Sequence, residues 1–287
     1  MDLPVNELLR PLTLPEALRA LASDPQARPL AGGTDLVVQM RAGRRRSGTL
    51  VDLGALGLAG IREREGGVEI GACTSMEALG SDPRVRAVCP ALAEAARLVG
   101  AWPIQCRATL GGNLANASPA ADTAPPLLVA DARVLLASSR GRREVPITEL
   151  FLGPGATCMA ADELILAVFV PPWLRPAGRA IDRFVKVGPR REQIISVVSL
   201  AARIAVSGGV VADVRLALGS VAPTPFRARA AERFLAGREV SAATRRRAAE
   251  VIQEDIAPID DVRAPAAYRR IAAAVLLDRA LAEVSGV

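Results

Sequence analysis

A short run rich in proline near residue 175 divides the chain into two parts with different secondary-structure patterns. Residues 171–178 read Pro-Pro-Trp-Leu-Arg-Pro-Ala-Gly, a composition that interrupts both helices and strands. Before this run, helical and extended segments alternate, whereas after it three extended segments precede three helical ones. A chain of 287 residues suits two modest domains. We therefore expect a first domain over residues 1–175, with subdomains of about 1–55 and 56–175, and a second over 179–287.

The first domain is predicted to alternate helices with strands. The spacing of Leu14, Leu18 and Leu21 is typical of one face of a helix over residues 14–22. Apolar runs bounded by turn residues indicate buried strands. These strands are expected at residues 28–30, 49–53, 67–72, 131–136 and 163–170, with further helices after Gly33 and within residues 82–99, there from Pro90 onward.

The second domain is predicted to be an α+β unit with a three-stranded antiparallel sheet and a helical bundle. Strands are expected at residues 183–187, 196–206 and 210–219, the last two joined by a hairpin turn at Ser207-Gly208-Gly209. Helices are expected at residues 225–237, 241–256 and 264–284. Consecutive strands followed by consecutive helices favour this class.

Histidine is absent from the chain. Its absence excludes Ser-His-Asp and Cys-His catalysis, histidine metal ligation and the commonest general base. Redox chemistry remains possible where a bound cofactor carries it. We therefore expect no catalytic side chain of these kinds.

The four cysteines indicate no metal site in this chain. Cys73, Cys89, Cys106 and Cys158 lie far apart and form no C-x-x-C pair, which argues against zinc and iron–sulfur ligation. We expect reduced thiols in the cytoplasm. The chain has no apolar run of 18 or more residues, so we expect no membrane span. Residues 1–4 lack the pattern of a signal peptide.

The net charge of +6 raises the question of nucleic-acid binding. The arginines are interspersed with acidic residues, as in Arg62-Glu63-Arg64-Glu65, and aromatic residues make up only 3% of the chain. Few rings leave little material for stacking bases. We expect no nucleic-acid partner; the basic residues could equally meet an anionic cofactor or an acidic partner subunit.

The first candidate site is a glycine pair between a predicted strand and a predicted helix. It reads Ala31-Gly32-Gly33-Thr34-Asp35-Leu36. Paired glycines let a backbone approach a ligand closely, and amides at a helix start attract phosphate. The segment matches neither the Walker loop nor the G-x-G-x-x-G fingerprint. When this segment is considered alone, an ordinary strand-to-helix turn is the commoner explanation for it.

A second glycine pair lies in residues 109–122, which read Thr-Leu-Gly-Gly-Asn-Leu-Ala-Asn-Ala-Ser-Pro-Ala-Ala-Asp. Hydroxyl and amide side chains flank Gly111-Gly112, and Asp122 follows nine residues after Asn113. Two amide cradles and an acid suited to ribose hydroxyls predict a dinucleotide with two phosphates. A turn or a helix cap is the alternative explanation for the acid.

Together these segments resemble the FAD-binding subunit of the molybdenum hydroxylases, the xanthine dehydrogenase and carbon monoxide dehydrogenase medium-subunit family. The resemblance continues in the family's order through residues 71–74, 186–190, 219–225 and 258–263. It implies an FAD-binding domain of the PCMH or vanillyl-alcohol-oxidase type, made of two α/β subdomains. A C-terminal α+β domain of the carbon monoxide dehydrogenase flavoprotein type would follow.

The resemblance also implies positions for a non-covalently bound FAD. Backbone amides of residues 30–36 would hold the pyrophosphate, and residues 109–113 would complete that cradle. Asp122 would bind the adenosine or ribityl side, Ile165 would contact the adenine region, and Lys186 would reach toward the flavin. The expected cofactor-binding residues are Arg28, Pro29, Leu30, Ala31, Gly32, Gly33, Thr34, Asp35, Leu36, Gly100, Ala101, Ile104, Thr109, Gly111, Gly112, Asn113, Ala117, Asp122, Ile165 and Lys186.

Lys186 is the only lysine among 36 basic residues. A compact ammonium retained inside a cofactor motif suggests contact with an anion. Our hypothesis is that Lys186 contacts FAD; a chance position is the alternative.

The first loop departs from one branch of the family. Carbon monoxide dehydrogenases of this family usually carry Gly-Gly-His-Ser where this chain has Gly32-Gly33-Thr34-Asp35, which disfavours carbon monoxide as the substrate. An asparagine that is usual before the second loop is replaced by Cys106.

The resemblance implies an electron-transfer subunit with no catalytic residue of its own. A large partner would carry molybdopterin, and a small partner would carry two [2Fe-2S] clusters that feed FAD. The acceptor would be NAD+, oxygen, a quinone or another carrier, and the assembly a heterotrimer or a dimer of heterotrimers. The alternatives are a self-contained FAD oxidase of the vanillyl-alcohol-oxidase type and a non-catalytic nucleotide-binding module.

Overall fold

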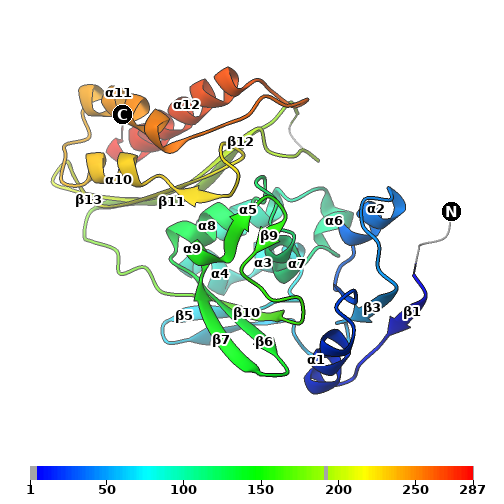
Figure 1. Cartoon of the computed structure of the whole chain (residues 1–287). Helices are drawn as coiled ribbons and strands as arrows, with labels where there is room; N and C mark the ends of the chain where they lie inside the picture. Colours follow the sequence, from blue (N-terminus) through cyan, green and yellow to red (C-terminus); the bar gives the residue numbers. More distant parts are fainter. Residues whose placement is uncertain (1–4, 191–192, 287) are drawn as a thin grey trace.

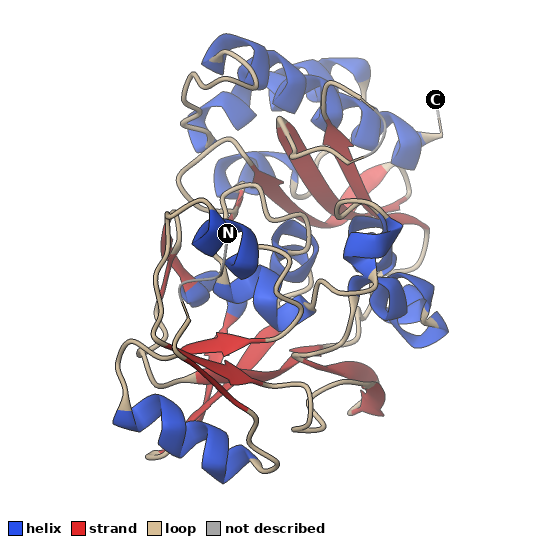
Figure 2. Cartoon of the chain, turned by 90° about the vertical axis from the view of Figure 1, so that its right-hand side faces the viewer, coloured by secondary structure: helices blue, strands red, loops and turns tan. Residues whose placement is uncertain are grey.

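The computed structural model of the chain describes residues 5–190 and 193–286. Residues 1–4, for which the sequence predicts no signal segment, lie outside the described residues, as do 191–192 and 287. Figure 1 shows four successive layers from bottom to top: a sheet, a group of helices, a second large sheet and a final group of helices, with the blue N-terminal strands to the right of the lowest layer. Figure 2 shows the same order after a turn of 90°.

The N-terminal sheet is small and parallel. Its order is β1-β3-β2, with β1 (Glu7–Leu9), β2 (Arg28–Leu30) and β3 (Thr49–Asp52). Helix α1 (Leu14–Ser23) buries Leu18 and Leu21 as predicted, and a capping box between Thr13 and Glu16 fixes its first turn. Helix α2 (Leu36–Arg41) follows the first glycine pair.

The larger sheet of the N-terminal half is antiparallel, with the order β4-β5-β10-β6-β7. Buried β5, β10 and β6 match predicted strands, whereas β4 and β7 were not predicted. The strands are β4 (Ile61–Arg64), β5 (Gly67–Gly71), β6 (Arg133–Ser138), β7 (Gly141–Pro146) and β10 (Leu164–Val170), and β8 (Phe151–Gly153) pairs separately with β9 (Ala156–Thr157).

Helices α3 to α9 lie between this sheet and the C-terminal sheet (Figure 1). Within residues 82–99 a helix begins at Pro90 as predicted, and a separate helix precedes it, because Pro90 cannot donate the backbone hydrogen bond that would continue that first helix. The helices are α3 (Met76–Ser81), α4 (Pro83–Val88), α5 (Pro90–Arg97), α6 (Trp102–Gln105), α7 (Leu110–Ala115), α8 (Ala124–Val129) and α9 (Ile147–Leu150).

The C-terminal half forms an antiparallel sheet of order β11-β12-β13-β14, covered by three helices. Gly208 and Gly209 both have positive φ, as the predicted hairpin requires. The elements are β11 (Arg179–Val187), β12 (Val198–Ser207), β13 (Val210–Gly219), β14 (Phe226–Arg227), α10 (Arg229–Leu235), α11 (Ala242–Asp255) and α12 (Ala266–Ser285).

The sheet has four strands, so the prediction of three is wrong. Residues 226–227, predicted as helix, pair with β13 through Leu218 and Phe226. Pro225 favours an extended residue before it, and the Ala228 amide still donates to Leu216 O. The helix therefore begins only at Arg229.

The α+β architecture is confirmed, and one apolar core joins its two halves. The core around α5, α8, β5 and β10 includes Phe184, Ala201 and Ala217 from the C-terminal sheet. Among the described residues no helix is long and apolar enough to cross a membrane. Residues 5–190 and 193–286 also contain no group of three or more potential metal ligands.

Candidate functional site

A cleft of about 580 Å³ lies where the first glycine loop meets the chain around α6 and α7. Its wall contains every residue predicted to bind the cofactor except Ala101, Ala117 and Lys186. Ala101 lines an adjoining cavity of about 390 Å³ that shares Gly100, Ile104, Ile194 and Ile195 with the cleft. Segments far apart in the sequence, including both glycine pairs, therefore meet at one site.

The first glycine loop presents unused backbone donors. The amides of Gly32, Gly33, Thr34 and Asp35 donate to no acceptor within residues 5–190 and 193–286. Gly33 has a φ of 71°, a conformation that glycine adopts without strain. Four consecutive free amides on a cleft wall are suited to an anion.

The second loop contacts the first through its backbone. A Cβ added to Gly32 would lie 1.8 Å from the carbonyl oxygen of Arg107, so the two loops approach as closely as a glycine allows. The side chain of Gln39 donates to Asn116 at 3.3 Å and also bonds to Asp35. These contacts fix α2 against the chain after α7.

In the second loop the amides of Leu110 to Asn113 are bonded within the chain, unlike the amides of the first loop. Leu110 N and Gly111 N donate to the carbonyls of Thr74 and Ala72, at 3.0 and 2.8 Å. Gly112 N bonds to Thr109 Oγ1 at 3.2 Å, and Asn113 N donates to Thr109 O. The loop borders the cleft with side chains and a closely packed backbone instead.

Asp122 lies in the cleft wall, and both of its carboxylate oxygens accept hydrogen bonds from residues outside that wall. Its Oδ1 accepts from Ser196 Oγ at 2.6 Å and its Oδ2 from Lys186 Nζ at 2.7 Å. Burial raises the pKa of Asp122, and the Lys186 charge, its hydrogen bond and the Ser196 hydrogen bond oppose that rise. The acid is therefore an oriented acceptor rather than a free base.

Lys186 is not among the residues of the cleft wall, but it contacts Asp122, which is. Its ammonium donates to Asp122, to Leu98 O at 2.7 Å and to Ile194 O at 3.3 Å. An ammonium has three protons, and all three have partners. Ala117 is likewise displaced from the wall: it is buried with a φ of 46°, and its carbonyl accepts from Gly155 N.

Sequence reasoning missed several residues of the cleft wall. Arg45 comes from the short arginine run after α2, and Glu163 precedes β10. Glu163 is paired with Arg143 at 2.6 Å and accepts from Ala160 N. The pairing of β10 with β6 brings the chain around Glu163 to the cleft, so no local motif marks Glu163.

Cys73 also lines the cleft, at the end of the motif that follows β5. Burial raises the pKa of its thiol to about 11, and the charge of Asp52 adds to the rise. The thiol is therefore almost entirely protonated near neutral pH and behaves as a small apolar contact.

Two family models match the chain end to end. The FAD binding domain in molybdopterin dehydrogenase matches residues 4–173, and the CO dehydrogenase flavoprotein C-terminal domain matches residues 183–284. The chain belongs to the FAD-binding subunits of the molybdenum hydroxylase family. This FAD subunit is accordingly an oxidoreductase component, and FAD is its cofactor.

Relatives with assigned names resemble the FAD subunit over almost their whole length. It is 35% identical to the xanthine dehydrogenase FAD-binding subunit of Escherichia coli O157:H7, over 91% of this chain and 89% of that one. It is 31% identical to the carbon monoxide dehydrogenase medium chain of Hydrogenophaga pseudoflava, over 97% and 96%. A carbon monoxide dehydrogenase structure from the same organism superposes with a TM-score of 0.94 at 32% identity, over 100% and 99% of the two chains.

The cleft of the FAD subunit fits the charge and size of the cofactor. The first loop, with its free amides, lines the same cleft as Arg28 and Arg45. Neither arginine forms an ion pair with a carboxylate in the part of the chain that the structure describes. The volume lies within the range of about 300–1,000 Å³ that is usual for ligand sites. A pyrophosphate at the first loop would satisfy both kinds of donor.

Proposed function

We propose that this subunit binds FAD non-covalently and passes electrons within a molybdenum hydroxylase complex. The observation that carries the proposal is the row of four free amides from Gly32 to Asp35 on the wall of the cleft that also presents Asp122. The amides would hold the FAD pyrophosphate, and Asp122 would accept from a hydroxyl of the cofactor's sugar or ribityl chain. The remaining residues predicted to bind FAD would line the cofactor, with Lys186 acting from behind Asp122.

The carboxylates of the cleft support an electron-transfer role over substrate oxidation by this chain alone. Asp35 is bonded to Gln39, Glu163 to Arg143, and Asp122 to Lys186 and Ser196. A general base must lie within hydrogen-bond reach of the proton that it removes, and each of these acids is engaged by neighbouring side chains of the chain itself. When bound, FAD supplies the redox chemistry by exchanging one or two electrons. The chain's residues bind it and orient it.

The finer parts of the proposal concern assembly. We propose a small partner with two [2Fe-2S] clusters as electron donor, a large molybdopterin partner as the site of substrate hydroxylation, and NAD+, oxygen or a quinone as acceptor. The complex would be a heterotrimer or a dimer of heterotrimers. The four free cysteines fit a reducing, cytoplasmic location. We also propose domain limits of 1–175 and 179–287, supported by the two family matches.

Purification of the chain with its genomic neighbours tests the proposal. The expected preparation is yellow, releases FAD on denaturation, and contains an iron–sulfur protein and a molybdopterin protein. Rapid reduction of the complex with its substrate should bleach the flavin absorbance only when the iron–sulfur partner is present. Substrate oxidation by the isolated yellow chain would instead support a self-contained oxidase, and a colourless chain that takes up no FAD would refute the proposal.

A further inference from the structure

The carboxylate of Asp122 is held in the cleft wall by side chains from the C-terminal half of the chain. Both of its oxygens accept bonds from behind, from Ser196 and Lys186. The side chains of Asp122 and Lys186 are 8% and 4% exposed, and Ser196 is fully buried. Because a carboxylate oxygen can accept more than one hydrogen bond, Asp122 keeps the capacity to accept from a ligand in the cleft.

Lys186 and Ser196 are fixed by the sheet to which they belong. Lys186 lies one residue before the end of β11, and Ser196 lies two residues before β12. Next to these two residues, the amide of Val197 donates to Val187 O at 2.8 Å and so joins the two ends of the segment that connects β11 to β12. The Ser196 carbonyl accepts from Ser220 Oγ at 2.9 Å. The two donors to Asp122 therefore occupy positions set by the C-terminal sheet.

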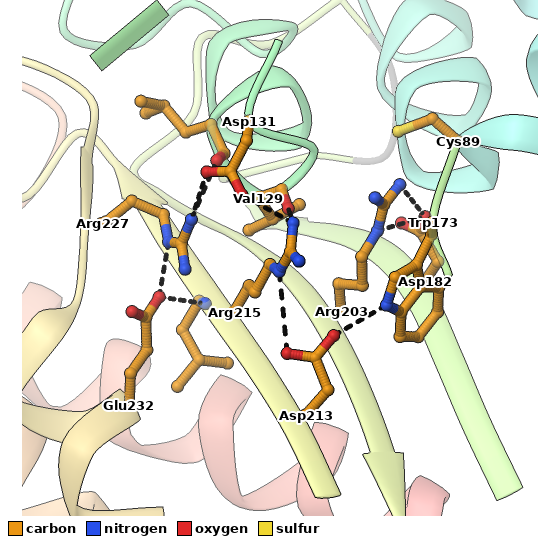
Figure 3. Close-up of polar contacts among 12 residues, drawn as sticks. Cys89, Val129, Asp131, Trp173, Asp182, Arg203, Asp213, Arg215, Arg227 and Glu232 are labelled. Carbon is orange, nitrogen blue, oxygen red and sulfur yellow. Dashed lines mark hydrogen bonds and ion pairs between the residues drawn. The ribbon is translucent and has the colours of Figure 1, made fainter. Parts of the chain in front are cut away.

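The same sheet also holds the far end of the segment that carries Asp122. Helix α8 begins two residues after this acid, and its last carbonyls face two arginines of the sheet (Figure 3). Arg227 donates to Leu128 O at 3.2 Å, and Arg215 donates to Val129 O at 3.5 Å. Both arginines also bond to Asp131, at 2.9 and 2.6 Å. The segment is thus fixed from the sheet at both of its ends.

We propose that Lys186 and Ser196 are positioning residues that keep the Asp122 carboxylate charged and aimed into the cleft, so that the C-terminal sheet completes the FAD site. The proposal rests on the proposed function, because it concerns how the same cleft binds FAD. Neither residue lines the cleft itself. Their effect on the cofactor passes through Asp122.

Titration of FAD into the full-length apo chain, followed by flavin fluorescence, tests this proposal. Lys186→Met leaves a buried carboxylate without its counter-charge, and we expect about a 10- to 100-fold rise in the FAD dissociation constant. Ser196→Ala removes one neutral donor and should raise it about 3- to 10-fold. Adding Lys186→Met to Asp122→Asn should cost little more than Asp122→Asn alone, because the two charges are then removed together.

The pH profile of FAD affinity separates positioning from general destabilisation. In Lys186→Met the pKa of Asp122 rises further, so FAD affinity should fall as the pH is lowered from about 9 to 6, whereas the parent chain should change less. Lys186 is the charged group in contact with Asp122. Arg28, Asp35, Arg45 and Glu163, the other charged residues of the cleft wall, are unchanged in each variant.

Arg203→Met is the matched control. Arg203 is also a buried cation of the C-terminal sheet, but it bonds to Asp182 and Val88 O and does not line the cleft (Figure 3). Its loss should lower the melting temperature and leave the FAD dissociation constant within about threefold. Lys186→Arg, which keeps the charge, should retain more affinity than Lys186→Met.

Two results would overturn the proposal: unchanged FAD affinity and pH profile in Ser196→Ala and the Lys186 variants, or an equal loss in Arg203→Met. Ser196→Ala keeps the ion pair and carries the test should Lys186→Met fail to fold. Failure of the parent chain itself to bind FAD would refute the proposed function instead, so that the two failures are distinguishable.

Discussion

The missing side chain of Gly32 determines how closely the two loops of the FAD site can approach. Its α-carbon lies against the carbonyl of Arg107, where an added methyl group would overlap the oxygen at 1.8 Å. The neighbour is backbone, which cannot rotate away as a flexible side chain could. Any larger residue must therefore displace the first loop from the second.

We predict that Gly32→Ala weakens FAD binding by at least about tenfold and destabilises the chain by about 1–3 kcal/mol, because backbone must shift to relieve the overlap. FAD titration and thermal unfolding of the apo chain measure the two effects. Gly153→Ala is the control, since a methyl group there meets open space. Equal FAD affinity in Gly32→Ala and the parent would show that the loops tolerate separation.

The thiols of Cys73 and Cys106 should differ in their response to FAD. Cys106 is exposed and outside the cleft wall, whereas Cys73 lies in it. With a pKa of about 11, only about one Cys73 thiol in a thousand is ionised at pH 8, and this fraction rises about tenfold for each pH unit below that pKa. Slow alkylation of Cys73 should accelerate from pH 8 to 9 and stop when FAD is bound.

Mass spectrometry of the alkylated peptides measures both rates. Cys106 should react at the same rate with and without FAD. Cys89 is fully buried, with a pKa raised to about 12, and should stay unmodified in the folded chain. Equal protection of Cys73 and Cys106 by FAD would indicate a general tightening of the chain rather than cover at the cleft.

Among the secondary-structure elements, α8 connects the cofactor cleft to the C-terminal sheet. It has six residues, every one of them buried, and a helix this short gains little stability from its own hydrogen bonds. Its position depends on the residues that flank it, Asp122 on one side and Asp131 on the other. Arg215 and Arg227 are the partners of Asp131 (Figure 3).

We predict that Arg227→Met destabilises the chain by about 3 kcal/mol. The change removes donors to Leu128 O and Asp131 and leaves the buried Glu232 with only the amide of Leu216 and the exposed Arg229 as partners. Arg229→Met is the matched control, because Arg229 pairs with the same Glu232 from an exposed position; it should change stability by less than about 0.5 kcal/mol. Urea unfolding of both variants compares them, and similar losses would mean that the α8 contacts contribute nothing.

At the scale of the whole molecule, the two halves share an apolar core and a layer of arginine contacts. We therefore predict a single unfolding transition in calorimetry of the apo chain. FAD at about 100 times its dissociation constant should stabilise that whole transition by about 2.7 kcal/mol. Two separate transitions, with only the first shifted by FAD, would contradict the coupling between the halves.

The sequence predicts this fold best where a pattern is local. The buried strands β5, β10 and β6 are continuous apolar runs, whereas β4 and β7 are edge strands of mostly exposed polar residues and carry no such signal. The glycine pairs identify the cleft, because each pair and the polar residues that flank it form a motif only a few residues long. Which of their amides are free depends on partners elsewhere, such as Thr74 and Ala72.

The contacts of Lys186 could not be predicted from the sequence. The motif around it indicates a role at the cofactor site, but its direct partner Asp122 lies 64 residues earlier in the chain. Two further acceptors, Leu98 O and Ile194 O, are backbone atoms that no composition or spacing can reveal. The sequence therefore identifies the residue, whereas these protein contacts of Lys186 follow only from the fold.

The unused amides of the first loop have a consequence for sequence variation. Recognition through main-chain atoms leaves the side chains at positions 34 and 35 less constrained than the glycines before them. Members of one family can then exchange these side chains while keeping the ligand. Position 34 is accordingly a practical attachment point for a fluorescent reporter of cofactor loading.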